Sequence, residues 1–298
     1  MTKLEPNKLR EENLKVVKNE TFSIERALYN SKDCFITNCE FKGEEDGESP
    51  LKESLNITVQ DSNFDLRYAL WHLKNSRIVG CHFSSSARAP FWYGNQIDIL
   101  ESKIESVKCL RECNGLIVQN SEISSEEPFW NCKDVIVVDS KIGGFYAFMG
   151  CKDISLNHVE FTGKYSFQYV KKLEINDSNL DTKDAFWHTS NAVIRNSTIK
   201  GEYIAWFAKN LTFINCVIES HQPFCYAKNI KFINCEMKNC DLSFENSTVK
   251  GTFTGTIESI KNPKKCNIVV PDVGELIEKD ALHKVKCKIK EPKTKVSN

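Results

Sequence analysis

The sequence lacks a net charge and a long apolar segment. Lys and Arg together number 40, as do Asp and Glu. This balance disfavours nucleic-acid binding, because neutralising phosphates usually requires a basic excess. No apolar run approaches the roughly 18 residues that a membrane-spanning helix needs. We therefore expect neither a nucleic-acid partner nor a membrane.

The short motifs of common catalytic and metal sites are also missing. The chain has no Gly-rich phosphate loop, Cys-x-x-Cys pair, nucleophile elbow or His-Glu-x-x-His motif. These absences leave enzymatic activity uncertain and predict neither a cofactor nor a metal. The charged start of the sequence contains no apolar stretch of signal-peptide length, so the 13 cysteines are expected to be reduced thiols. The expected location is cytoplasmic.

What the chain does contain is a repeat. An Asn or Asp followed by Ser or Cys recurs, and we call the second residue of this pair the anchor. Seven consecutive intervals between anchors, from Ser102 to Cys235, are 19 residues long. Intervals of 23 and 21 residues near the start indicate two turn insertions, and a final interval of 12 indicates a shortened last coil. The anchors are Cys39, Ser62, Cys81, Ser102, Ser121, Ser140, Val159, Ser178, Ser197, Cys216, Cys235 and Ser247.

Apolar residues stand five and three positions before each anchor, two positions after it and again eight after it. The residues between them are mostly polar, and this alternation predicts short, half-buried strands that bury their apolar faces only when coils stack. Three apolar clusters per repeat predict three short strands per coil. The expected fold is an all-β, right-handed parallel β-helix (a solenoid) of about eleven to twelve 19-residue coils over residues 34–255.

Both ends are expected to cap the coils. Residues 1–33 are predicted to be an N-terminal cap and residues 256–298 a C-terminal cap segment, because an open sheet edge invites aggregation. Val273, Leu276 and Ile277 follow Pro271 and Asp272 at a spacing that fits a short helix, although a returning strand fits this segment too.

Asn and Asp dominate the position just before the anchor, as in Asn38, Asp61, Asn120, Asn215 and Asn234. Both residues tolerate the left-handed conformation of a sharp bend. This column resembles the asparagine ladder of pectate-lyase-type β-helices. Within that superfamily the chain is most similar to an uncharacterised intracellular family of short-coil β-helix proteins with no assigned reaction.

All five tryptophans lie in one column, nine residues after an anchor, except that Trp92 follows Cys81 by eleven because of the insertion there. Strand alternation predicts that this column points outward, with Arg111 between Trp92 and Trp130 at cation–π distance. The column comprises Trp71, Trp92, Arg111, Trp130, Met149, Gln168, Trp187, Trp206 and Cys225. The next column, whose direction the pattern leaves open, comprises His72, Tyr93, Glu112, Asn131, Gly150, Tyr169, His188, Phe207 and Tyr226.

These two columns hold the candidate site. The resemblance implies a polysaccharide cleft along the outer face of one sheet, with Arg111 and Glu112 in it, although the calcium-binding and catalytic motifs of pectate lyases are missing. The candidate catalytic residues are His72, Arg111, Glu112 and His188. The candidate ligand-binding residues are Trp71, Trp92, Tyr93, Trp130, Asn131, Tyr169, Trp187 and Trp206.

Two functions fit the two columns. The first is carbohydrate binding on an outward aromatic stripe, with weak lyase or hydrolase activity if the protein is an enzyme. The alternative is a non-enzymatic scaffold whose stripe is buried in a homo-oligomer or partner interface. A column of three cysteines, Cys113, Cys132 and Cys151, fits packing better than metal binding, because other coils hold small residues there.

Overall fold

The computed structural model describes residues 13–43 and 47–292, and a division between Glu160 and Phe161 separates two compact units. Unit 1 precedes this division and unit 2 follows it. The fold is a parallel β-solenoid of about 14 turns spaced about 19 residues apart, which confirms the predicted class. The expected count of eleven to twelve was too low because the coils at the ends lack the anchor pair.

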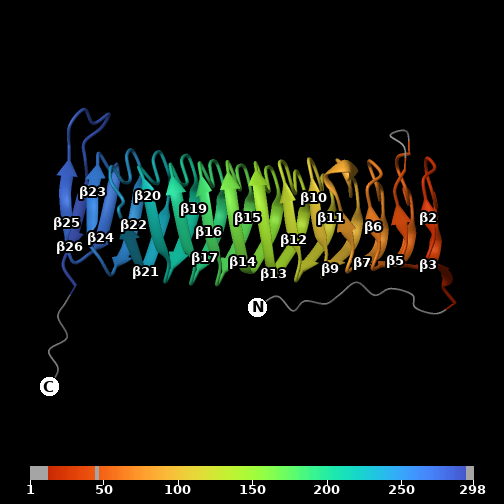
Figure 1. Ribbon diagram of the computed structural model, residues 1–298. Helices are drawn as coiled ribbons and strands as arrows, with labels where there is room; N and C mark the ends of the chain where they lie inside the picture. The colour runs from red at the N-terminus through yellow and green to blue at the C-terminus, as the bar shows by residue number, and fades with distance from the viewer. Residues whose placement is uncertain (1–12, 44–46, 293–298) are drawn as a thin grey trace, which may run out of the picture. The chain divides into compact units, whose positions relative to one another are not determined.

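Unit 1 contains two ladders of parallel strands (Figure 1). The longer strands run β1, β3, β5, β7, β9, β11 and β13 in order, and the shorter ones run β2, β4, β6, β8, β10 and β12 before pairing with β13. The elements are β1 Lys15–Lys18, β2 Thr21–Phe22, β3 Lys32–Thr37, β4 Glu40–Phe41, β5 Leu55–Gln60, β6 Asn63–Phe64, β7 Lys74–Val79, β8 His82–Phe83, the 3-10 helix η1 Ser85–Ala87, β9 Asn95–Leu100, β10 Lys103–Ser106, β11 Asn114–Gln119, β12 Glu122–Ser125 and β13 Lys133–Phe145.

Strand β14 Lys152–Lys164 crosses the division. In unit 2 the longer ladder runs β15, β17, β19, β21, β22, β24 and β26, while β16, β18 and β20 continue into the second half of β21, and β23 pairs with β25. The strands are β15 Lys171–Asn176, β16 Asn179–Lys183, β17 Ser190–Arg195, β18 Thr198–Glu202, β19 Lys209–Ile214, β20 Val217–His221, β21 Ile230–Lys238, β22 Thr248–Phe253, β23 Ile257–Lys261, β24 Lys265–Val269, β25 Val273–Ile277 and β26 Cys287–Lys290.

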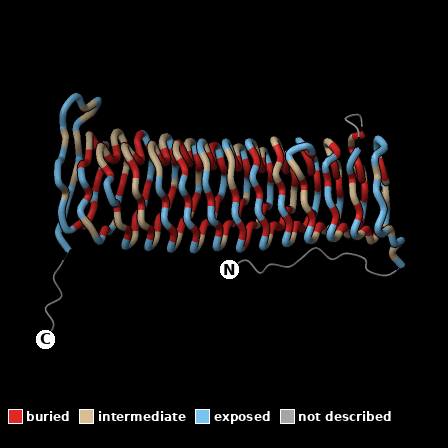
Figure 2. Tube along the Cα trace, viewed as in Figure 1, coloured by how far each residue is buried: buried red, intermediate tan, exposed pale blue. Residues whose placement is uncertain are grey.

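The predicted apolar columns form the core of each unit. Ile36, Val59, Ile99 and Val118, for example, are fully buried, and buried residues recur from coil to coil as far as Val270 (Figure 2). Aromatic rings at equivalent positions stack, as Phe41 does on Phe64 with centroids 4.4 Å apart. Offset stacking of this kind adds about 0.5–1.5 kcal/mol per pair beyond the burial of apolar area.

The asparagine ladder before the anchor is confirmed. Its members have φ near +50°, and Asn215 donates from its side-chain amide to Asn196 at 3.2 Å while receiving the same bond from Asn234 at 3.0 Å. A second ladder, which the sequence analysis missed, links Asn191, Asn210 and Asn229 at 2.9 and 2.8 Å. Asn supplies both a side-chain donor and an acceptor, so each rung bonds the rungs on either side of it.

The prediction of three strands per coil is wrong for most coils, because their third side is built from turns with isolated bridges such as Trp92 to Arg111. Positive φ recurs at every second residue there, as at Ala205 (+60°) and Phe207 (+58°). Ala205 is fully buried, whereas Phe207 is 42% exposed. An extended strand would place residues two apart on the same face. The alternating left-handed conformation therefore changes which columns face the core.

The structure bears on one predicted insertion and on the predicted shortened last coil. The insertion between Cys81 and Ser102 contains η1. The shortened last coil is wrong, because β22 pairs Val249 with Ile230, which stands five residues before the anchor Cys235. Ser247 is therefore not an anchor. Its hydroxyl accepts a hydrogen bond from the Ala227 amide at 2.7 Å, as the thiol of Cys151 does from the amide of Cys132.

Strand pairing continues past the expected limits of the β-helix, at β1 and at β24 to β26. The capping roles of residues 1–33 and 256–298 therefore remain a prediction, and residues 1–12 and 293–298 lie outside the described residues. Of the two alternatives for the segment after Pro271, the helix is wrong and the returning strand is correct: β25 pairs in register with β23. Backbone pairing at the end of the stack outweighed the helical spacing of its apolar residues.

Candidate functional site

The tryptophans predicted to point outward are half-buried. In four of them the indole Nε1–H donates to a main-chain carbonyl on the following coil. Trp187 bonds the carbonyl of Tyr203 at 2.7 Å and Trp206 that of Gln222 at 2.9 Å. Gln168 makes the equivalent bond to the carbonyl of Asp184 at 3.1 Å. These residues hold successive turns together, so only part of each indole is available to a ligand.

Arg111 occupies the tryptophan column in unit 1, as predicted. Its guanidinium carbon lies 4.6 Å from the ring centroid of Trp92 and 4.5 Å from that of Trp130. The guanidinium also donates to Glu127 at 2.7 Å, and Lys108 lies 3.3 Å from the same carboxylate. Because its side chain is 17% exposed, this cation stabilises the stack of indoles and has little freedom to reach a ligand.

The exposed aromatic surface is the neighbouring column, and its clearest stretch is in unit 2. We call Tyr169, His188, Phe207 and Tyr226 the outer ladder. Successive rings stack with centroids 4.8, 5.0 and 5.1 Å apart and planes within 15° of parallel. Tyr169 is 52%, Phe207 42% and Tyr226 38% exposed. Stacking covers the inner ring faces, so this surface offers ring edges, two phenol hydroxyls and an imidazole.

A row of lysines lies two residues beyond the outer ladder. Lys171, Lys209 and Lys228 follow Tyr169, Phe207 and Tyr226, and all three are exposed. Lys209 and Lys228 are partners in a parallel bridge, so they stand on adjacent coils. None of the three forms an ion pair with the residues that the structure describes. The aromatic surface is thus flanked by positive charge that no neighbouring carboxylate neutralises.

The candidate catalytic residues are not assembled into an acid–base pair. His72 stacks on Tyr93 with centroids 4.9 Å apart, and His188 lies between Tyr169 and Phe207 in the outer ladder. The main chain places Tyr93 on the coil between those of His72 and Glu112. Within the described part of the chain, Glu112 makes no ion pair. Asn131 is exposed on the coil after that of Glu112.

A histidine–carboxylate pair that the sequence analysis missed lies in unit 2. The Nδ1 of His221 is 2.7 and 2.9 Å from the two carboxylate oxygens of Asp241. Tyr203 packs edge-on against both His221 and Trp206, with centroids 5.5 and 5.6 Å apart, and thereby links this pair to the outer ladder, since Trp206 packs against Phe207. The separation of 20 residues, about one coil, is the sequence signal that would have placed them together.

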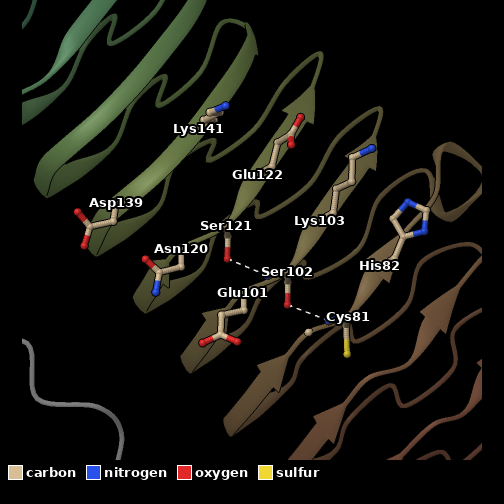
Figure 3. A pocket seen from close by; sticks show the side chains of 11 residues that line it. Cys81, His82, Glu101, Ser102, Lys103, Asn120, Ser121, Glu122, Asp139 and Lys141 are labelled. Atoms are coloured by element: carbon tan, nitrogen blue, oxygen red, sulfur yellow. Dashed lines mark hydrogen bonds between the residues drawn. The ribbon is translucent and has the colours of Figure 1, made fainter.

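Unit 1 also carries a shallow polar hollow along the tight turns (Figure 3). Its floor is formed by small anchors: the hydroxyl of Ser102 accepts from the amide of Cys81, and that of Ser121 from the amide of Ser102, both at 3.1 Å. Longer side chains form its two rims, Glu101, Asn120 and Asp139 on one and His82, Lys103, Glu122 and Lys141 on the other. The hollow therefore follows from the repeat itself.

The three stacked cysteines of unit 1 pack as polar core residues. The thiol of Cys132 donates to the carbonyl of Leu110 at 2.9 Å and that of Cys151 to the carbonyl of Phe129 at 2.6 Å. Burial raises the pKa of Cys113 and of Cys132 well above the ordinary thiol value. The thiolate that a metal requires is therefore disfavoured at neutral pH.

Fold and site together define a parallel β-solenoid with an aromatic ladder on its turn-built side. Residues 15–290 match the family described as a protein of unknown function, DUF3737, and the chain belongs to this family. No curated protein matches the sequence. Within the described residues, no helix is long and apolar enough to cross a membrane.

Solved structures with a similar fold include proteins of several functions. The surface adhesin PfbA of Streptococcus pneumoniae is 8% identical with a TM-score of 0.38, and the match covers 87% of this chain and 82% of the adhesin. The A-module of the mannuronan C-5 epimerase AlgE6 of Azotobacter vinelandii is 7% identical with a TM-score of 0.30, and the match covers 94% of this chain and 90% of the module. The endo-xylogalacturonan hydrolase of Aspergillus tubingensis is 10% identical with a TM-score of 0.30, and the match covers 93% of this chain and 85% of the hydrolase. Similarity this distant carries no argument about function.

Proposed function

We propose that the protein is a carbohydrate-binding module that binds acidic saccharide chains along the outer ladder of unit 2. The observation that carries the proposal is the exposure of four stacked aromatic residues beside three unpaired lysines. Exposed aromatic surface of this extent marks an interaction site. The phenol hydroxyls of Tyr169 and Tyr226 and the ammonium groups of the lysines are hydrogen-bond donors.

This arrangement favours an acidic saccharide over a nucleic acid. Single-stranded nucleic acid binds by stacking bases on open ring faces, and the inner rings of the outer ladder already cover one another. A saccharide offers hydroxyl oxygens to the partly positive ring edges, hydroxyls to the phenols and carboxylates to the lysines. One ring and about one lysine per coil would let successive sugar units make similar contacts.

The proposal does not include a chemical step. Among the candidate catalytic residues, His72 and His188 stack on aromatic rings, and Arg111 is held between two indoles. The candidate ligand-binding residues Trp187, Trp206 and Tyr169 belong to the proposed surface or border it. We propose that Trp71, Trp92, Tyr93, Trp130 and Asn131 of unit 1 make weaker contacts of the same kind.

An array of acidic and neutral oligosaccharides tests the proposal, followed by titration of the best ligand. We expect acidic saccharides to bind and the double variant Phe207→Asn, Tyr226→Asn to weaken binding at least about tenfold. Lys209→Glu should also weaken binding, and by a larger factor at low ionic strength than at high ionic strength, because charge repulsion is then less screened. The matched control is Phe145→Asn, which replaces an exposed aromatic residue of unit 1 outside both columns. No bound saccharide, or equal affinity of the double variant and the control, would refute the proposal.

A homo-oligomer or protein interface is the second candidate, favoured by the 42% exposure of Phe207, which has no polar atom to bind a sugar. Light scattering at several concentrations separates the two: a concentration-dependent mass that Phe207→Asn abolishes supports an interface. A cytoplasmic location remains part of the proposal, supported by 13 cysteines in the free form, of which 12 are buried.

A further inference from the structure

Cysteines at equivalent positions on neighbouring coils are common in this chain, and one such pair differs from the rest. Cys266 on β24 and Cys287 on β26 are direct partners in the parallel register, so their side chains stand side by side on the same face of adjacent strands. Cys266 is 1% exposed. Cys287 is half-buried, because β26 is the terminal strand of its ladder and no described strand packs over its inward side.

The pair Cys216 and Cys235 provides the comparison. These two cysteines also stand on adjacent coils, each one residue before the register partners Val217 and Glu236, but they are 1% and 0% exposed. The stacked cysteines of unit 1 are equally buried. Among the described residues, Cys287 is therefore the member of a stacked thiol pair that a dissolved reagent reaches.

The environment of Cys287 favours its thiol as a nucleophile. A hydrogen bond from Cys266 lowers the pKa of the Cys287 thiol, although burial and Glu278 oppose this effect. The same contact raises the pKa of Cys266. A half-exposed thiol that ionises readily, with a buried thiol against it, matches the attacking and resolving cysteines of thiol–disulfide exchange.

We propose that Cys287 and Cys266 form a thiol–disulfide exchange site that reacts with a low-molecular-weight disulfide. The Cys287 thiolate attacks one sulfur of the disulfide, forms a mixed disulfide and releases one thiolate of the reagent. Cys266 then loses its proton and attacks the Cys287 sulfur, which forms the Cys266–Cys287 bond and releases the second thiol. Two protein thiols are oxidised and one small disulfide is reduced to two thiols.

The bond would fasten the end of the solenoid. Strand β26 is held to β24 over four residue pairs, and Lys288, Ile289 and Lys290 are exposed. A short terminal strand of this kind opens locally more easily than the strands inside the stack. A covalent link to the buried strand β24 would suppress this opening, so the terminal coil would respond to the thiol–disulfide balance around it.

The test treats the full chain with glutathione disulfide and identifies the products by mass spectrometry of alkylated peptides. We expect a Cys266–Cys287 disulfide in the native protein and no modification at either position in Cys287→Ser. In Cys266→Ser, the mixed disulfide of Cys287 with glutathione should accumulate because no resolving thiol remains. Cys235→Ser is the matched control and should react like the native protein.

Amide hydrogen exchange gives a second readout that does not depend on the variants. Oxidation should slow exchange in residues 287–290 at least about tenfold and leave β19 unchanged. An unmodified Cys287 in the folded native protein, or a mixed disulfide that persists there although Cys266 is present, would overturn the proposal. Saccharide binding plays no part in either measurement, so this proposal and that of the previous section fail independently.

Discussion

The column ten residues after the anchor differs between the two units. In unit 2 it holds the four aromatic residues of the outer ladder, whereas in unit 1 two rings are followed by Glu112, Asn131 and Gly150. The backbone is nonetheless the same, with φ between +52° and +70° at these three positions and near +58° in the outer ladder. The turn therefore forms without an aromatic side chain.

This comparison indicates how much the outer ladder contributes to stability. Asn and Gly adopt positive φ at little cost, whereas other residues lose about 1–2 kcal/mol there. Stacking returns about 0.5–1.5 kcal/mol per ring pair, and the exposed rings bury little additional area. Aromatic residues at these positions of unit 2 thus bring no clear gain in stability. The difference between the units teaches that the outer ladder is dispensable for the fold, which is what a binding surface requires.

Among substitutions in the two columns, the largest effect should come from the half-buried cation of unit 1. Arg111→Ala is expected to lower the free energy of unfolding by about 2–4 kcal/mol, because it removes contacts with two indoles and leaves a half-buried carboxylate with only Lys108 nearby. Urea denaturation measures the change. Exposed Lys133→Ala should cost no more than about 0.5 kcal/mol. Equal costs for the two variants would show that Arg111 does not stabilise the tryptophan column.

Alkaline pH should weaken both units through their buried thiols. Burial raises the pKa of Cys81 in unit 1 and of Cys225 in unit 2 to about 12. Since the unfolded thiols titrate near pH 9, this stabilisation is complete below that value and is lost as pH rises from 9 toward 12. Each thiol contributes up to about 1.4 kcal/mol per pH unit in this window.

Urea denaturation at pH 8, 9 and 10 measures the loss. Cys81→Ser and Cys225→Ser should each reduce the decline in unfolding free energy between pH 9 and 10, relative to the native protein. If either variant declines as steeply as the native protein, the ionisation of that thiol does not contribute.

The comparison itself is tested by transferring the unit 1 residue type to unit 2. Phe207→Asn should change the free energy of unfolding by no more than about 1 kcal/mol, because lost stacking and relieved backbone strain offset each other. Phe224→Ala, at a fully buried position two residues before Tyr226, should cost about 3–5 kcal/mol. Thermal or urea unfolding of both variants measures these changes. A loss of unfolding free energy in Phe207→Asn comparable to that in Phe224→Ala would make the outer ladder a structural feature.

The smallest effect concerns the tight turns. Glu101 stands in the asparagine-ladder column with φ +51°, where Asn is better suited. Glu101→Asn should stabilise unit 1 by about 0.5–1 kcal/mol, whereas Asn215→Ala in unit 2 should cost about 1 kcal/mol through its ladder hydrogen bonds. Unfolding midpoints check both, and a destabilising Glu101→Asn would show that the glutamate has a role in the polar hollow.

Much of the fold could be predicted from the sequence because strand alternation follows from neighbouring residues, and stacking joins residues at a constant spacing of about 19. The spacing of Val118 and Val137, of Asn196 and Asn215, and of Arg111 between two tryptophans placed each residue next to its actual neighbour. The register of the last coil was not readable, because the Asn246–Ser247 pair imitates the anchor pair on a different side of the coil. Only the strand pairing of Val249 with Ile230 distinguishes the two positions.

By itself, the sequence determined that coils of about 19 residues stack, which columns form the core, and that all five tryptophans share one column. Only the tertiary structure decided that these indoles are half-buried and that the column after them is the exposed one. The physical reason lies in the third side of each coil, where left-handed residues alternate and the rule that every second side chain shares a face no longer holds. The tertiary structure also brought His221 to Asp241, since their contact depends on the local length of one coil.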